Sequence, residues 1–157
     1  MLSKLCVLSI LICGLSAARV GPDADFDRIK ALQGNWKIEA EGKPLGIEMS
    51  YDVGSKESIV AERFGKELSI FYRNGQAVEM IHFCNVGNQP RLRLKDVREP
   101  DVLDFEMFAI TNLCTPDTPH VQEIIYKDKM LDANTMGLEI VWWPKTRGSE
   151  KYKLHRS

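Results

Sequence analysis

Two histidines, His82 and His120, are the side chains of this 157-residue chain best suited to acid–base chemistry or to metal and haem ligation. His82 alternates with Val78, Met80 and Cys84, and His120 alternates with Gln122, Ile124 and Tyr126. In a β-strand these two sets each share one face, so we expect both histidines to point inward. No third His or Cys stands at metal-ligand spacing, since His155 lies near the last residue. We therefore predict no catalytic residue, no metal and no cofactor. Both histidines could simply be buried and hydrogen-bonded.

A polar cluster follows Cys84 and includes Asn85, Asn88, Gln89 and Arg91. Arg91 could bind a ligand carboxylate or carbonyl at the mouth of a binding site, because its guanidinium donates two parallel hydrogen bonds. The amides could instead satisfy backbone groups at a strand corner. Arg91 and Arg93 share one face, and only an inward orientation would bring Arg91 to a ligand.

The chain lacks the sequence motifs that are typical of several other kinds of chemistry. The chain has no Gly-x-Ser-x-Gly, His-Glu-x-x-His, phosphate-loop or dinucleotide-binding motif. Its 21 basic and 22 acidic residues leave a formal charge of −1. We therefore predict no nucleic-acid partner, which would need Lys and Arg clustered on one face.

The elements that must position these residues are short strands. Alternating apolar and polar residues cover 36–41, 47–52, 58–64, 68–72, 78–84, 91–95, 103–107, 120–126, 136–143 and 150–154. Asn74-Gly75 is a strong hairpin signal. The pattern predicts an all-β fold, an antiparallel up-and-down β-barrel of about 8–10 strands, because short connections favour pairing between neighbours. A β-sandwich is the alternative.

One short helix should precede the strands. Asp25 to Gln33 carries apolar residues at helical spacing, with Asp25 as a candidate N-cap, and Gly34 should end the helix.

The first eighteen residues read as a signal peptide. Lys4 precedes an apolar run from Leu5 to Leu15, and small residues occupy the expected cleavage positions before Arg19. The run is too short to span a bilayer, which needs about 20 residues. Lipidation of Cys13 is a competing interpretation, but Ile12 does not suit that signal. We expect residues 1–18 to be removed, leaving 19–157 as one secreted domain (extracellular, or periplasmic in a bacterium) with no membrane span.

Cleavage would leave two cysteines, Cys84 and Cys114. In an oxidising compartment we expect them to form a disulfide, which would stabilise the fold by about 3–4 kcal/mol. Two free thiols are the alternative.

Two motifs carry a family resemblance. Gly34-Asn35-Trp36 resembles the Gly-x-Trp signature of the lipocalins and the wider calycin superfamily. The stretch Ile81–Arg91 is similar to the His-Tyr-Cys…Gly-Asn-Gln-Pro-Arg block of a family of small secreted lipocalin-like domains, although Phe83 replaces the usual Tyr. A single His120 also replaces a richer histidine cluster. The resemblance implies a barrel whose closed end is plugged by Trp36, and it implies no settled ligand or reaction.

These observations lead us to expect a barrel that binds a small, mainly hydrophobic ligand in its interior. The expected ligand-binding residues are Trp36, Met80, His82, Arg91, Phe105, Met107, His120 and Ile140. A barrel filled by its own side chains would instead be an extracellular structural or interaction protein. A third hypothesis is a haem-binding or isomerase-type enzyme that uses His82 or His120.

Overall fold

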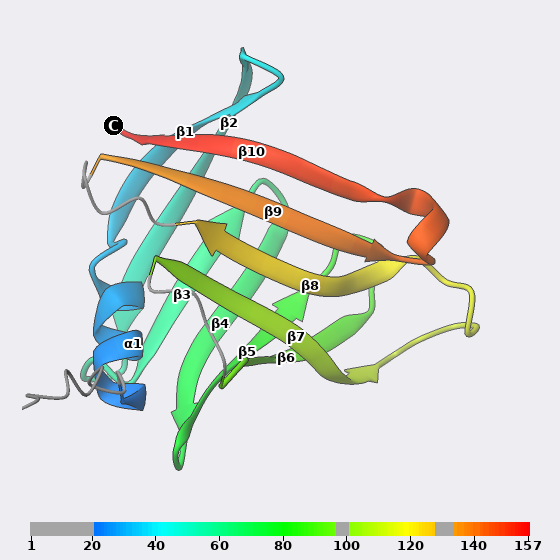
Figure 1. Cartoon of the computed structure of the whole chain (residues 1–157), viewed down its shortest axis with the longest axis horizontal. Coiled ribbons are helices and arrows are strands. Elements are labelled where there is room, and N and C mark those ends of the chain that lie inside the picture. Colours follow the sequence, from blue (N-terminus) through cyan, green and yellow to red (C-terminus); the bar gives the residue numbers. More distant parts are fainter. Residues whose placement is uncertain (1–20, 97–100, 128–133) are drawn as a thin grey trace, which may run out of the picture.

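In the part of the chain that the structure describes, ten antiparallel strands close into a barrel behind one short helix (Figure 1). The computed structural model describes residues 21–96, 101–127 and 134–157, so the predicted signal peptide lies outside the described residues. After helix α1 (Pro22–Lys30), the strands are β1 (Gly34–Ala40), β2 (Lys43–Gly54), β3 (Ile59–Phe64), β4 (Glu67–Asn74), β5 (Ala77–Phe83), β6 (Gln89–Leu94), β7 (Val102–Thr111), β8 (His120–Lys127), β9 (Thr135–Trp143) and β10 (Ser149–Arg156), with the 3-10 turn η1 (Lys145–Arg147) between the last two.

Every strand pairs with its neighbours in sequence, and β1 pairs with β10 to complete the circle. The all-β, up-and-down barrel predicted from the alternation is therefore confirmed, and the sandwich alternative is wrong. The Asn74-Gly75 turn joins β4 to β5 as expected, with Gly75 at a φ of 60°. In the described part of the chain, no helix has the length and apolar character needed to cross a bilayer.

Helix α1 begins earlier than predicted. It starts at Pro22, with Gly21 as its N-cap, and it ends at Lys30. Asp25 therefore lies inside the helix, and the prediction that it caps the N-terminus is wrong. Pro22 explains the shift, because its fixed φ suits the first helical position and its missing N–H costs nothing there.

One end of the barrel is closed by α1 and by the turn that leads into β1. The Trp36 indole is 1 % exposed and donates to the Leu32 carbonyl at 2.8 Å. The Arg156 guanidinium lies 4.5 Å from the centre of the Trp36 ring and donates to the carbonyls of Ala31 and Gln33. Gly34 has a φ of +125°, and a Cβ there would lie 3.2 Å from Arg156 Nη1. The turn therefore needs glycine for both its conformation and its space.

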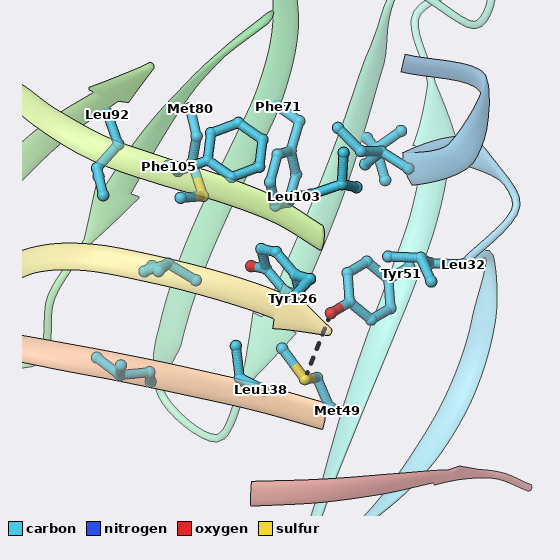
Figure 2. Packing of buried hydrophobic residues seen from close by; sticks show 14 of the residues in the cluster. Leu32, Met49, Tyr51, Phe71, Met80, Leu92, Leu103, Phe105, Tyr126 and Leu138 are labelled. Carbon is cyan, nitrogen blue, oxygen red and sulfur yellow. Dashed lines mark hydrogen bonds between the residues drawn. The ribbon is translucent and has the colours of Figure 1, made fainter. Parts of the chain in front are cut away.

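The middle of the barrel is filled by its own side chains. Phe71, Phe105 and Tyr126 pack edge to face, with ring centroids 5.5–6.1 Å apart (Figure 2). Trp36 and Tyr51 form a similar pair at 6.4 Å. All five side chains are at most 2 % exposed, so this part of the interior is a packed aromatic core.

Two strand irregularities change which side chains face inward. The β6–β7 register shifts between Arg91 and Leu92, and the β8–β9 register shifts between Val121 and Glu123. Each shift places two residues of one strand opposite one residue of its partner. Beyond that point, the inward-facing and outward-facing positions of the strand with the extra residue are exchanged.

The end of the barrel opposite α1 is called the mouth here. It carries the connections after β1, β3, β5, β7 and β9, which cover residues 41–42, 65–66, 84–88, 112–119 and 144–148. Figure 1 shows η1 and the β7–β8 connection together at this end, far from α1.

Candidate functional site at the barrel mouth

A pocket of about 310 Å³ opens at the mouth. Its walls combine aromatic and aliphatic side chains with charged ones, supplied mainly by the β3–β4 and β5–β6 turns and the β9–β10 region. The apolar lining residues are Ile47, Phe64, Val86, Ile140, Trp142 and Tyr152, and the charged ones are Lys66, Glu67, Arg147 and Glu150. An apolar wall with a few placed charges is the usual composition of a small-molecule site.

The rim of this pocket holds its charges in defined positions. The Arg147 guanidinium lies 4.1 Å from the centre of the Trp142 ring, a cation–π contact. The Tyr152 hydroxyl donates to Glu150 Oε2 at 2.7 Å, and burial together with Glu150 raises the pKa of Tyr152. Phe64 packs edge to face on Tyr152 at 5.4 Å.

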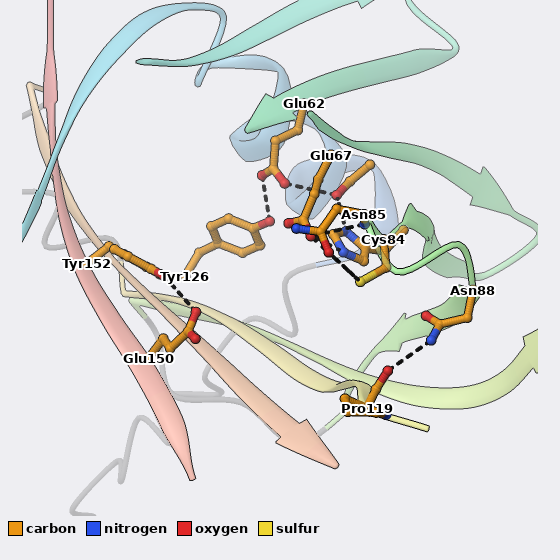
Figure 3. A network of polar contacts seen from close by, with 11 residues as sticks. Glu62, Glu67, Cys84, Asn85, Asn88, Pro119, Tyr126, Glu150 and Tyr152 are labelled. Atoms are coloured by element: carbon orange, nitrogen blue, oxygen red, sulfur yellow. Dashed lines mark hydrogen bonds and ion pairs between the residues drawn. The ribbon is translucent and has the colours of Figure 1, made fainter. Parts of the chain in front are cut away.

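Glu67, at the start of β4, lies at the base of the pocket and connects it to the interior (Figure 3). Its side chain is 12 % exposed. Oε1 accepts the backbone N–H of Asn85 at 3.2 Å and the Cys84 thiol at 3.6 Å, and Oε2 lies 3.8 Å from His82 Nε2. Burial raises the pKa of Glu67, although the hydrogen bonds from Asn85 and Cys84 oppose that shift.

A chain of buried polar groups continues from this point across the barrel. The Ser69 hydroxyl donates to Glu62 Oε1 at 2.9 Å, and the Tyr126 hydroxyl donates to Glu62 Oε2 at 2.7 Å. Ser69 Oγ also lies 3.0 Å from His82 Nδ1. Glu62 is on β3 and Tyr126 on β8, so the contact spans the interior rather than a strand pair. Burial is the main reason that the pKa of Glu62 is raised.

This hydrogen-bond network assigns the tautomer of His82. Ser69 has one hydroxyl proton, which goes to Glu62, so the contact with His82 must be a donation from Nδ1–H to Ser69 Oγ. Nε2 then carries the lone pair, and in the described part of the chain it has no hydrogen-bond partner. Burial lowers the pKa of His82 to about 4, which keeps the ring neutral at pH 7.

Most of the predicted ligand-binding residues do lie inside the barrel. Trp36, Met80, His82 and Phe105 are at most 3 % exposed, Ile140 is 4 % exposed, and Met107 is partly buried against the core. Ile140 lines the mouth pocket, and His82 contacts Glu67 at its base. Trp36 and Phe105 instead belong to the packed aromatic core.

Arg91 does not have the inward orientation that it would need to bind a ligand inside the barrel. β6 buries Pro90, Leu92 and Leu94 on its inner face, so Arg91 and Arg93 both project outward. Arg91 is 40 % exposed at its side chain, and it stacks on Phe108 and lies 3.6 Å from Glu79. Burial of the apolar residues on β6 decides the orientation, and Arg91 takes no part in the mouth pocket.

The prediction that His120 points inward is also wrong. The register shift after Val121 puts Val121, rather than His120, on the inner face with Ile124 and Tyr126. His120 pairs with Trp143, stacks on its ring at 6.3 Å, and contacts the Thr118 carbonyl at 2.8 Å through Nδ1. It is buried beneath the β7–β8 connection on the outside of the barrel.

The predicted disulfide is absent. Cys84 and Cys114 are both free thiols in the described structure. Cys84 is buried with its sulfur directed at Glu67, whereas Cys114 is exposed in the β7–β8 connection. The two side chains point into different environments, and pairing would remove the Cys84–Glu67 contact.

Alternation in the sequence does not single out Glu62, Glu67 and Ser69. Over 68–72 it makes Leu68, Ile70 and Tyr72 the apolar set of the strand, but β4 buries Ser69 and Phe71 on its inner face. A signal was available in the Asn74-Gly75 turn. A tight turn there pairs Asn74 with Ala77 and so, counting back along both strands, pairs Ser69 with His82.

The comparisons with known proteins assign no family. No protein-family model matches the chain, and no curated protein matches it in sequence.

Proposed function

We propose that this chain is a secreted, lipocalin-like protein that binds a small, mainly apolar molecule at the barrel mouth. The main support is the mouth pocket, because it joins aromatic and aliphatic walls to fixed charges in one concave site. The proposal places the ligand nearer the solvent than the sequence alone suggests, since side chains already fill the middle of the barrel.

The pocket volume limits the ligand. About 310 Å³ is near the lower end of the range of about 300–1,000 Å³ for small-molecule sites. The ligand is therefore a compact molecule of up to about three rings rather than a long acyl chain. Such a molecule would pack on Ile140, Phe64 and Val86.

The charges favour a ligand with an acidic end. Arg147 stacks on Trp142 at the rim, where it can hold a carboxylate or sulfonate while the apolar part enters the pocket. Glu150 is already hydrogen-bonded to Tyr152, and Glu67 to Asn85, so the carboxylates are engaged within the protein.

A direct test uses the fluorescent probe 1-anilinonaphthalene-8-sulfonate, which combines aromatic rings with a sulfonate. We expect saturable binding of one probe per chain. Val86→Trp should abolish it by filling the pocket, and Arg147→Gln should weaken it about tenfold, the equivalent of about 1.4 kcal/mol. Phe83→Trp is the matched control, since Phe83 is 42 % exposed outside the pocket lining. Equal binding by wild type and Val86→Trp would contradict the proposal.

The packed interior supports a second candidate, an extracellular structural or interaction protein whose barrel is only a scaffold. Absence of saturable probe binding to the wild type would favour this candidate. The haem-binding or isomerase hypothesis uses His82 or His120. His120 lies on the outer face of the barrel, so only His82 is left to support this hypothesis.

A further inference from the structure

Three potential metal ligands converge beneath the mouth pocket. They are the Glu67 carboxylate from β4, His82 Nε2 from β5 and the Cys84 sulfur directly after β5. One donor atom from each lies within 4.8 Å of the other two. Glu67 Oε1 is 3.6 Å from the sulfur, and Oε2 is 3.8 Å from Nε2.

These separations are close to those around a tetrahedral ion. Zn²⁺ bonds of about 2.0–2.3 Å to O, N and S, at tetrahedral angles, place neighbouring ligand atoms about 3.3–3.6 Å apart. The two contacts of Glu67 are within a few tenths of an ångström of that range. Small side-chain rotations would therefore complete the geometry without moving the strands.

His82 is oriented as a ligand by its neighbours. Its Nδ1–H donates to Ser69, which is held in turn by Glu62, so Nε2 presents its lone pair toward Glu67 and Cys84. The His82 side chain is 4 % exposed, and Nε2 has no hydrogen-bond partner in the described part of the chain. A metal-binding histidine usually donates its other ring N–H to a fixed acceptor in this way.

We propose that Glu67, His82 and Cys84 bind a Zn²⁺ ion, with its fourth coordination position directed toward the mouth pocket. One nitrogen, one sulfur and one carboxylate oxygen suit a borderline-soft ion and do not suit Ca²⁺ or Mg²⁺, which prefer oxygen ligands. On binding, the Cys84 thiol loses its proton to solvent, and the thiolate and the carboxylate together balance the charge of the ion. This inference rests on the three side chains and not on the proposed mouth ligand.

The test is to titrate the metal-free protein with Co²⁺ as a spectroscopic substitute, and then to displace the Co²⁺ with Zn²⁺. We expect one Co²⁺ per chain, a sulfur-to-cobalt charge-transfer band and the visible bands of tetrahedral cobalt. Cys84→Ser should remove the charge-transfer band. Cys114→Ser is the matched control, because Cys114 is an exposed free thiol away from the cluster, and it should leave the spectrum unchanged.

Circular dichroism shows whether Cys84→Ser folds. If it does not fold, two further variants keep the proposal testable. Glu67→Gln, at a partly exposed position, should weaken Zn²⁺ binding at least about tenfold, and Ser69→Ala should weaken it about 10- to 100-fold through loss of the His82 orientation. A wild-type spectrum without sulfur-to-cobalt charge transfer would overturn the proposal, as would loss of the band in Cys114→Ser or unchanged affinity in Glu67→Gln. Binding of the fluorescent probe is a separate readout, so the two proposals fail independently.

Discussion

Arg156 should contribute more to stability than an ordinary residue on the last described strand. Its guanidinium donates to the Gln33 carbonyl at 2.6 Å and the Ala31 carbonyl at 2.9 Å, and it covers the Trp36 ring. These contacts tie the end of β10 to the turn between α1 and β1. Replacing Arg156 with Ala removes all of them at once.

The size of the effect can be worked out contact by contact. A hydrogen bond from a charged donor contributes about 1.5–3 kcal/mol. Ala31 and Gln33 are exposed, so water can hydrate their carbonyls after the substitution, and the lower figure applies to each. A partly exposed cation–π contact adds about 0.5–1 kcal/mol. Arg156→Ala should therefore lower the free energy of unfolding by about 3.5–4 kcal/mol, which corresponds to roughly 10–15 °C in Tm.

Urea unfolding followed by tryptophan fluorescence measures this difference. Arg156→Lys should lose about half as much, because an ammonium keeps the charge but cannot reach both carbonyls as a planar fork. A double-mutant cycle with Trp36→Phe should give a coupling of about 0.5–1 kcal/mol. A loss below about 0.5 kcal/mol for Arg156→Ala, or wild-type stability for Arg156→Lys, would refute this reasoning.

Two other predictions follow from the free thiols and from the outer-face carboxylate. Cys114 should react rapidly with a thiol reagent in the native protein, because it is exposed, whereas the buried Cys84 should react only on unfolding. Equal reaction rates for the two thiols would contradict the structure. So would the absence of any free thiol after denaturation without a reductant. The pKa of Glu79 lies below its usual 4.5, since hydrogen bonds from Arg93 and Tyr72 outweigh the opposing effect of burial. A lowered pKa stabilises the fold at pH values above 4.5, and that stability is lost as the carboxylate protonates on acidification. The difference in unfolding free energy between wild type and Glu79→Gln should therefore shrink between about pH 7 and pH 3, and a constant difference would contradict this cause.

The fold could be predicted because most of its determinants are local. Period-two alternation identified ten strands, and short turns such as Asn74-Gly75 favoured pairing between neighbours. The inward orientation of His82 followed from the same alternation on β5. Gly34 and Trp36 marked the closed end correctly, since a helix-to-strand turn and a buried indole leave clear signals in the sequence.

The site could be predicted only in part, because it depends on strand phase and on contacts between distant strands. One extra residue near Gln122 reversed the orientation of His120, and alternation carries no sign of such a shift. Glu62 meets Tyr126 across the barrel, a contact that exists only after closure. The predicted disulfide was wrong because the number of cysteines does not show where either side chain points. In the structure, the Cys84 side chain points toward Glu67.

The pairing of β1 with β10 also affects how the chain folds. It joins Trp36 to Arg156, near the two ends of the described chain, so this pairing carries the largest loop-closure entropy of any strand contact in the barrel. During synthesis, β1 must wait for β10 to leave the ribosome, and until then β1 and β9 are edges with unpaired backbone groups. Exposed edges of this kind recruit other strands. The interval before the barrel closes is therefore when the chain is most prone to aggregate, and contacts that speed closure would protect it more than contacts that only stabilise the finished barrel.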